Sequence, residues 1–228
     1  MVIKGLVSSR SQAESWIGLG KVTVDGRPAN KPGQFVQNNA DVRLAATEQY
    51  VSRAGLKLAS VAELLGFQFT NQVVLDVGSS TGGFTDYALR HGAKKVIAVD
   101  VGTDQLHPSL RGNEHIELHE KTDIRDFTTD DKIDIVVIDV SFISLREILP
   151  SVVKIAPGAQ VVAMVKPQFE AGREQVSKGV IKNDAIRRQI LRDFETWSKQ
   201  HFVIRGKRDS EVAGTKGNRE RFYLLNIS

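Results

Sequence analysis

The chain of 228 residues contains no cysteine, so disulfides, thiolate zinc sites and a cysteine nucleophile are excluded. No apolar run approaches the ~20 residues that a membrane-spanning helix needs. The N-terminal residues, MVIKGLVSSR, lack the apolar core of a signal peptide. The histidines are scattered without ligand spacing, and no metal site is predicted. We therefore expect a soluble, cytoplasmic protein without a membrane partner.

The composition is that of an ordinary globular protein, with 41% hydrophobic and 25% charged residues. The length fits one medium domain together with a small module. A net charge of +4 and a pI of about 9.3 favour an acidic partner such as nucleic acid. Because many soluble proteins are slightly basic, charge alone decides little.

The chain divides into a short, turn-rich part and a longer part with an α/β rhythm. We expect a small α+β module over residues 1–45, a linker over 46–50 and a larger domain over 51–228. Continuous apolar runs in the larger domain predict an α/β fold with a doubly wound, mostly parallel sheet covered on both faces. The predicted strands are 73–77, 96–100, 116–118, 133–139, 161–166 and 222–225, and the predicted helices are 85–91 and 185–200.

A glycine-rich turn, DVGSSTGGFT, follows the first of these strands and opens a helix. It does not fit the dinucleotide fingerprint, because Ser80 occupies the place of the second glycine, and no Gly-Lys-Ser/Thr completes a P-loop. The turn instead looks like the cofactor loop of Rossmann-like methyltransferases, which implies S-adenosylmethionine as cofactor. The candidate cofactor residues in this turn are Asp76, Gly78, Ser79, Ser80, Thr81, Gly82, Gly83 and Phe84.

Two further carboxylates are candidates for the same site. Asp100 ends the second predicted strand, where a carboxylate can accept hydrogen bonds from ribose hydroxyls. Asp123 follows a predicted short strand and could reach the adenine amino group. The alternative for Asp76 and Asp100 is an ordinary strand-end turn residue, and the Thr-Asp-Ile-Arg stretch around Asp123 is otherwise uninformative.

Methylation of a hydroxyl needs alignment with the methyl donor and a base that removes the proton. Asp139 and Lys166 end consecutive predicted strands, so both should point into the crevice at the carboxyl edge of the sheet. A lysine ending a buried strand is unusual, and its alternative role is a surface lysine with a buried stem. Lys57 and Glu220, taken alone, are ordinary surface charges.

Together, five segments in order give the chain a specific resemblance. They are SRAGLKL, DVGSSTGGFTD, AVDVG, IDVSFISL and VKPQFEAGRE, and they resemble the TlyA/hemolysin-A family, which is related to FtsJ-type ribose methyltransferases. The resemblance implies a catalytic tetrad of Lys57, Asp139, Lys166 and Glu220, with Lys166 as the base. It further implies methylation of a cytidine 2′-hydroxyl in ribosomal RNA.

The first residues contain a helix signal followed by a hairpin signal. Ser11 and Glu14 have the spacing of a capping box and predict a helix over residues 9–17. Residues 21–24, followed by the turn at Asp25 and Gly26, predict a hairpin, and residues 41–44 predict another strand.

This part resembles the RNA-binding domain of ribosomal protein S4, through GLVSSRSQA, GKVTVDG and KPG. Relative to that family, its start is expected to be truncated. The resemblance implies phosphate contacts by basic residues, and the alternative is a solvated basic face. The candidate RNA-binding residues are Arg10, Lys21, Arg27 and Lys31.

The sequence as a whole predicts an S-adenosylmethionine-dependent RNA methyltransferase whose partner is ribosomal RNA or a ribosomal subunit, without an obligatory protein partner. Two alternatives remain open at this point. One is a non-enzymatic RNA-binding protein that keeps the fold. The other is a cytolysin, as the hemolysin label suggests, although the chain lacks a strongly amphipathic pore segment.

Overall fold

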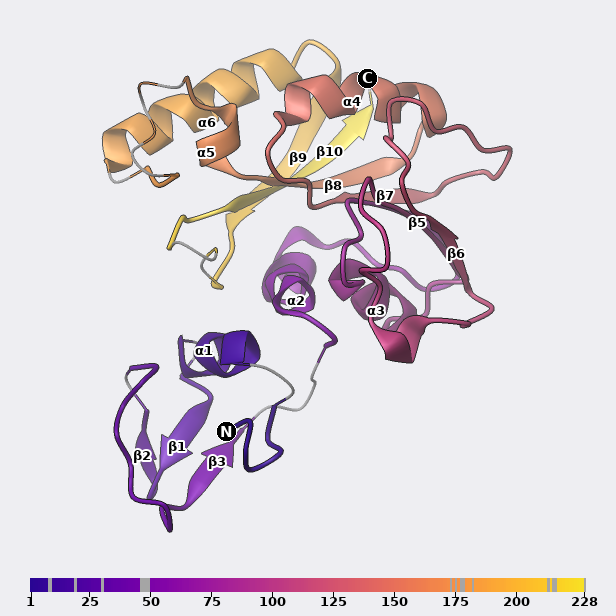
Figure 1. Ribbon diagram of the computed structural model, residues 1–228. Helices are drawn as coiled ribbons and strands as arrows, with labels where there is room; N and C mark the ends of the chain where they lie inside the picture. Colours follow the sequence, from indigo (N-terminus) through magenta and orange to yellow (C-terminus); the bar gives the residue numbers. More distant parts are fainter. Residues whose placement is uncertain are drawn as a thin grey trace.

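The computed structural model shows a small N-terminal part beside a larger α/β body (Figure 1). Of the predicted linker, residues 46–50, the first four lie outside the described residues, so the domain boundary stays a prediction. The structure describes residues 1–7, 10–18, 20–29, 31–45, 50–172, 174, 176, 179–181, 183–212, 214 and 217–227.

In the N-terminal part, a helix lies against an antiparallel sheet of strand order β2-β1-β3. The predicted hairpin is confirmed, because Asp25 and Gly26 both have positive φ, at 49° and 75°, between paired strands. The predicted capping box is wrong, because Ser11 lies inside the helix and Glu14 pairs with Arg10 instead. The elements are α1 (Arg10–Gly18), β1 (Val22–Val24), β2 (Arg27–Pro28) and β3 (Val42–Leu44).

The larger body is built on a sheet of strand order β6-β5-β4-β7-β8-β10-β9. Neighbouring strands from β6 to β8 are parallel, whereas β10 pairs antiparallel with both β8 and β9. The predicted doubly wound, mostly parallel sheet is therefore confirmed. Its strands are β4 (Val73–Val77), β5 (Lys95–Val99), β6 (Ile116–His119), β7 (Ile135–Ile138), β8 (Gln160–Val165), β9 (Phe202–Asp209) and β10 (Arg221–Ile227).

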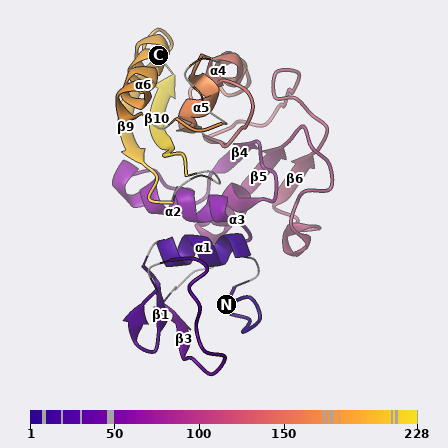
Figure 2. The same ribbon diagram turned by 60° about the vertical axis from the view of Figure 1, so that its left-hand side comes forward.

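Helices cover both faces of this sheet, as Figures 1 and 2 show. Alternate strand residues point to opposite faces, so Val74 packs into one core and Leu75 into the other. None of the helices in the described segments is both long and apolar enough to cross a membrane. The first core lies against α2 (Arg53–Leu65) and α3 (Gly83–Arg90), the second against α4 (Leu145–Ile155) and α6 (Asp184–Ser198), and the short elements are η1 (Pro108–Leu110) and α5 (Pro167–Glu170).

Helix α2 approaches α3 closely at a pair of glycines. A Cβ at Gly55 would lie 2.9 Å from the carbonyl oxygen of Gly83 and 2.5 Å from Cβ of Tyr50. Ser52 caps the start of α2, because its hydroxyl accepts from the amide of Ala54 at 3.3 Å. This approach fixes α2, and with it Lys57, against the first turn of α3.

We predict that Gly55→Ala destabilises the protein by about 1–3 kcal/mol, because the added methyl group overlaps backbone that cannot move aside. Gly18→Ala is the control, since a Cβ there meets no atom of the described part of the chain within 4 Å and the alanine favours the helix. Urea denaturation of both variants measures the difference. Equal stability of Gly55→Ala and the wild type would show that the two helices are not tightly packed.

Candidate active site

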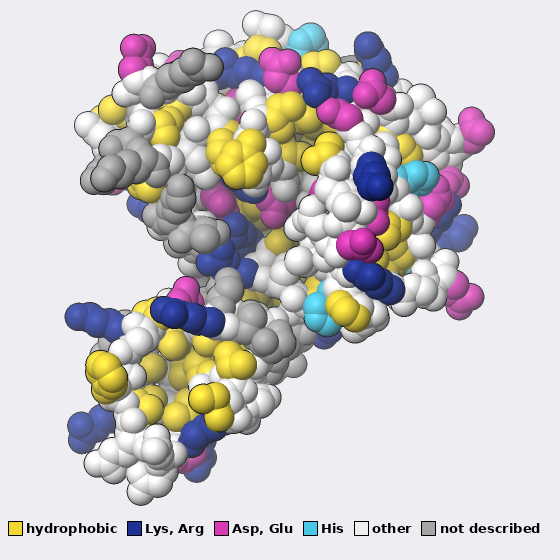
Figure 3. Space-filling model, in the orientation of Figure 1, with side chains coloured by type: hydrophobic (Ala, Val, Ile, Leu, Met, Phe, Trp, Pro, Cys, Tyr) yellow, Lys and Arg dark blue, Asp and Glu magenta, His cyan; other side chains and the backbone are white. Residues whose placement is uncertain are grey.

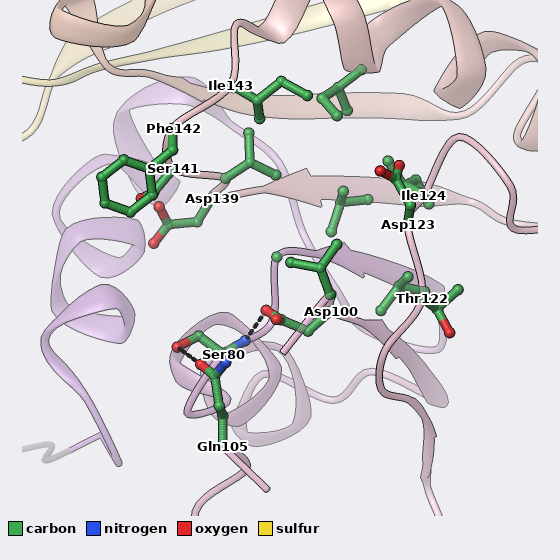
Figure 4. A pocket seen from close by; sticks show the side chains of 16 residues that line it. Ser80, Asp100, Gln105, Thr122, Asp123, Ile124, Asp139, Ser141, Phe142 and Ile143 are labelled. Atoms are coloured by element: carbon green, nitrogen blue, oxygen red, sulfur yellow. Dashed lines mark hydrogen bonds between the residues drawn. The ribbon is translucent and has the colours of Figure 1, made fainter. Parts of the chain in front are cut away.

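A crevice lies at the carboxyl edge of the sheet, where the strand order reverses. From β4 the chain proceeds outward to β5 and β6 and then returns to β7 on the other side of β4. Such a switch point is where doubly wound folds bind ligands. A cavity of about 420 Å³ opens there (Figure 4), within the usual size range of small-molecule sites. Its lining includes Gly78, Ser80, Asp100, Gln105, Asp123, Asp139, Ser141 and Phe142.

The turn after β4 forms one wall of this cavity. Gly78 has a φ of 81°, and a Cβ there would lie 2.8 Å from the carbonyl oxygen of Asp139, so glycine is required. The amide of Ser80 donates to Asp100 Oδ2 at 2.8 Å, and the amide of Gly102 donates to Asp100 Oδ1 at 2.7 Å. These bonds hold the Asp100 carboxylate at the cavity wall, and each of its oxygens keeps a lone pair for a ligand.

Asp123 lines the cavity from the loop after β6 (Figure 4). Its carboxylate accepts hydrogen bonds from the guanidinium of Arg125, at 3.0 Å to Oδ1 and 2.7 Å to Oδ2. The side-chain hydrogen bonds from Arg125 hold the pKa of Asp123 below its usual value. Asp123 is therefore an anionic acceptor whose position is fixed by its neighbour.

The remaining glycine-turn candidates are not among the residues that line the cavity. A Cβ at Gly82 would meet Leu110 at 2.5 Å, and the Phe84 ring packs 6.1 Å from that of Phe222. Packing therefore explains why glycine stands at position 82 and phenylalanine at position 84. The cofactor roles of all six remaining candidates stay predictions. The group consists of Asp76, Ser79, Thr81, Gly82, Gly83 and Phe84.

Asp76 lies within β4 and is completely buried. Its Oδ2 accepts from the hydroxyl of Thr85 at 2.7 Å, whereas its Oδ1 has no hydrogen-bond partner among the described residues. Desolvation outweighs the hydrogen bond from Thr85 and raises the pKa of Asp76 to about 7. Asp76 thus holds the first turn of α3 behind the cavity wall.

The four predicted catalytic residues lie along the same sheet edge as two ion pairs. Nζ of Lys166 is 2.6 Å from Oδ1 of Asp139, which follows the neighbouring strand β7. Lys57 on α2 pairs with Glu220, and their side chains are only 8% and 4% exposed. Because Arg221 pairs with Val165 across β10 and β8, Glu220 lies beside the strand end that carries Lys166.

The sequence position of Lys57 gave no sign that its side chain is buried. An isolated lysine on a helix is normally exposed, but here Glu220 neutralises the ammonium group inside the protein. A buried ion pair contributes little net stability, yet removing one partner leaves an uncompensated charge. A contribution to stability alone therefore does not account for this buried pair.

The predicted RNA-binding residues lie on the N-terminal part, where Figure 3 shows Lys and Arg side chains on the surface. Arg10 and Lys31 both line a shallow hollow with apolar walls, and Lys21 and Arg27 are not among its lining residues. Arg10 is 89% exposed and its Nε lies 3.0 Å from Oε1 of Glu14. Only two of the four residues are therefore brought together, and their RNA contacts stay a prediction.

Comparison with known proteins gives the family. The sequence profile described as "FtsJ-like methyltransferase" matches residues 50–227, and the profile described as "S4 domain" matches residues 1–42. The chain belongs to the FtsJ-like methyltransferase family. The predicted fold class is confirmed with it.

Curated relatives confirm the resemblance to the TlyA/hemolysin-A proteins. The 16S/23S rRNA (cytidine-2′-O)-methyltransferase TlyA of Mycobacterium tuberculosis is 38% identical over 233 residues, which are 99% of this chain and 87% of that protein. The 23S rRNA (cytidine-2′-O)-methyltransferase TlyA of Campylobacter jejuni is 42% identical over 180 residues, 78% of this chain and 71% of that protein. Hemolysin A of Brachyspira hyodysenteriae is 37% identical over 98% of this chain and 95% of its own.

A solved structure of a hemolysin-named protein from Streptococcus thermophilus matches this FtsJ-like methyltransferase with a TM-score of 0.77. It is 37% identical, and the match covers 98% of this chain and 84% of that chain. The two-part architecture is thus shared with a solved structure over nearly its full length.

Several site residues of this FtsJ-like methyltransferase were missed from the sequence. The hydroxyl of Ser141 accepts from Nζ of Lys166 at 2.8 Å, and Gln105 accepts from the hydroxyl of Ser80 at 3.0 Å. Phe142 is 91% exposed at the cavity, with a φ of 67°. The position of Ser141, two residues after Asp139, could have indicated that it belongs to the site. Nothing in the sequence predicts the positive φ of Phe142.

We predict that Asp76→Asn gains stability over the wild type as pH rises from 4 to 7. The folded-state pKa of about 7 lies above the ordinary aspartate value of 3.8, so the folded protein binds the proton more tightly than the unfolded chain. The contribution of Asp76 to wild-type stability therefore falls across this window, by roughly 4 kcal/mol at about 1.4 kcal/mol per pKa unit, and the asparagine variant escapes that loss. Urea denaturation at several pH values measures the difference, and parallel pH profiles would contradict a raised pKa.

Proposed function

We propose that this chain transfers a methyl group from S-adenosylmethionine to the 2′-hydroxyl of a cytidine in ribosomal RNA. The observation that carries the proposal is the amine of Lys166, which contacts Asp139 and Ser141, two residues that line the cavity at the switch point. The activities for which the Mycobacterium tuberculosis and Campylobacter jejuni relatives are named supply the substrate class.

The cavity residues fit the proposed cofactor. Asp100 presents a carboxylate whose free lone pairs suit ribose hydroxyls, and Gly78 leaves room where a Cβ would collide with backbone. Asp123 is an acceptor suited to an adenine amino group. When bound, S-adenosylmethionine supplies an electrophilic methyl group on a positively charged sulfur.

The chemistry required of the protein is alignment and proton removal. The Lys166 side chain, once it has lost the ammonium proton that it carries in the ion pair, would take the proton from the ribose 2′-hydroxyl while that oxygen bonds to the methyl carbon and the carbon–sulfur bond breaks. The proton ends on Nζ of Lys166, where Asp139 at 2.6 Å stabilises the resulting ammonium. Ser141 fixes the direction of the amine.

The second ion pair supports the same site. Lys57 and Glu220 flank the Lys166 strand end and are shielded from water, so their charges are screened little. We infer that this pair helps to fix the position of Lys166. The N-terminal part, with its S4-domain match, would hold the RNA through phosphate contacts, and a ribosomal substrate implies a cytoplasmic enzyme.

We predict that Lys166→Ala lowers methyl transfer at least ~100-fold, because general-base catalysis contributes about that much, while cofactor binding survives. Transfer of a radiolabelled methyl group to isolated ribosomal subunits, followed by mapping of the modified nucleotide, measures the effect. The control is Lys94→Ala, which removes an exposed lysine just before β5, at the opposite edge of the sheet.

Each other outcome has a definite meaning. Transfer by Lys166→Ala at the wild-type rate removes the proposed base. Absence of cofactor binding by the wild type favours a non-enzymatic RNA-binding protein with this fold. Lysis of red cells by purified protein, unaffected by Lys166→Ala, favours a cytolysin.

We predict that Asp100→Ala weakens S-adenosylmethionine binding by about 10–100-fold, because hydrogen bonds to a charged group contribute ~1.5–3 kcal/mol. Titration calorimetry measures the dissociation constant. Glu114→Ala, which removes a carboxylate that is 90% exposed, is the matched control. Equal affinity of Asp100→Ala and the wild type places the cofactor elsewhere.

A further inference from the structure

Two segments run side by side beyond the Lys166–Asp139 ion pair. One is the loop after β7, residues 139–145, and the other is residues 166–170, which follow β8. They are joined at three successive points: Lys166 contacts Asp139 and Ser141, the Phe169 ring lies 5.2 Å from that of Phe142, and Glu170 binds Ser144 and Leu145. The contacts keep the same order along both segments, so the two behave as one unit.

Glu170 makes the contact farthest from the amine, and its side chain is 1% exposed. The hydroxyl of Ser144 donates to its Oε2 at 2.6 Å, and the amide of Leu145 donates to its Oε1 at 2.7 Å. Burial raises the pKa of Glu170, partly offset by these hydrogen bonds and by Arg146. Among the described residues, the opposing charge that acts on Glu170 is that of Arg146, with Nε 3.7 Å away.

Helix α4 already has its own cap without Glu170. Ser144 is the N-cap, and its hydroxyl accepts from the amide of Arg146 at 3.1 Å. Glu170 therefore adds a connection between α5 and the start of α4, in addition to the cap within α4. That connection fixes the far end of the loop whose near end holds the amine.

The loop between these two ends contains a residue in an unfavourable conformation. Phe142 has a φ of 67°, a region in which a bulky side chain costs about 1–3 kcal/mol and which persists only where the surroundings hold it. Because Phe142 lies between Ser141 and Ser144, release of the Ser144 end would let the loop relax. Ser141, and with it the amine of Lys166, would then move.

We propose that Glu170 is a positioning residue for methyl transfer, which fixes the 139–145 loop at Ser144 and Leu145 and thereby sets the position of the Lys166 amine. This inference rests on the proposed function of Lys166. Glu170 itself touches neither the cavity lining nor the amine in the contacts of the described residues.

The variants Glu170→Ala and Glu170→Gln separate positioning from charge. In single-turnover transfer to ribosomal subunits, Glu170→Ala is expected to lower the rate about 10–100-fold, since a displacement of ~1 Å in a reacting group can cost that much. Affinities for cofactor and RNA should stay within about 3-fold, because those contacts are elsewhere. Glu170→Gln should recover most of the rate, since its amide can accept from Leu145 and donate to Ser144.

Asp134→Ala is the matched control for loss of a carboxylate that binds backbone. Oδ2 of Asp134, just before β7, accepts at 2.9 Å from the amide of Val73, the first residue of β4, so this contact lies at the far edge of the sheet. This variant should lose stability but keep its transfer rate when assayed at a temperature at which all variants are folded. An equal fall in rate in Asp134→Ala and Glu170→Ala reduces Glu170 to a structural residue and overturns the proposal.

A second measurement does not depend on activity. The ammonium group of Lys166, held by Asp139 and Ser141, should give a ¹⁵Nζ–¹H cross-peak at low temperature, assigned by its absence in Lys166→Ala. We expect this peak to shift or vanish in Glu170→Ala and to persist in Glu170→Gln and Asp134→Ala. An unchanged peak in Glu170→Ala overturns the inference, whereas failure of the wild type to transfer any methyl group overturns the proposed function alone.

Discussion

The parallel pairing of β7 with β8 is the constraint on which the candidate site depends. It brings the ends of two strands to one edge of the sheet, so that Asp139 and Lys166, distant in sequence, meet at 2.6 Å. The cavity lies on the same edge because β4 and β7 are neighbours at the switch point. The proposed cofactor site and the proposed base are thus placed together by strand order.

Sequence reasoning succeeded where burial imposes a pattern. Apolar runs such as 73–77 and 135–138 mark strands covered on both faces, and polar residues directly after them mark the crevice. It failed for α4, whose interior contains Pro150, and for β9, an edge strand in which three apolar residues are followed by a mostly charged stretch. Neither element carries the signal that identifies its type when it is read in isolation.

The candidate site was only partly predictable for a related reason. The Lys57–Glu220 pair joins α2 to the start of β10, and no local pattern shows that two charges so far apart share one buried space. These two residues were predicted from the family resemblance, and the structure shows that they form a buried ion pair. The glycine turn shows the opposite case, because Gly78 and Ser80 line the cavity while Gly82 and Phe84 serve packing within the same motif.

The position of β10 in the sheet has a consequence for folding during synthesis. This strand follows the other sheet strands in the chain yet lies between β8 and β9, and it carries Glu220 just before its first residue. During synthesis, β9 emerges first but has no partner in the sheet until β10 inserts beside it. A nascent chain therefore exposes a lysine without its counter-ion and an incomplete sheet, and it acquires a finished active site only when translation has passed this strand.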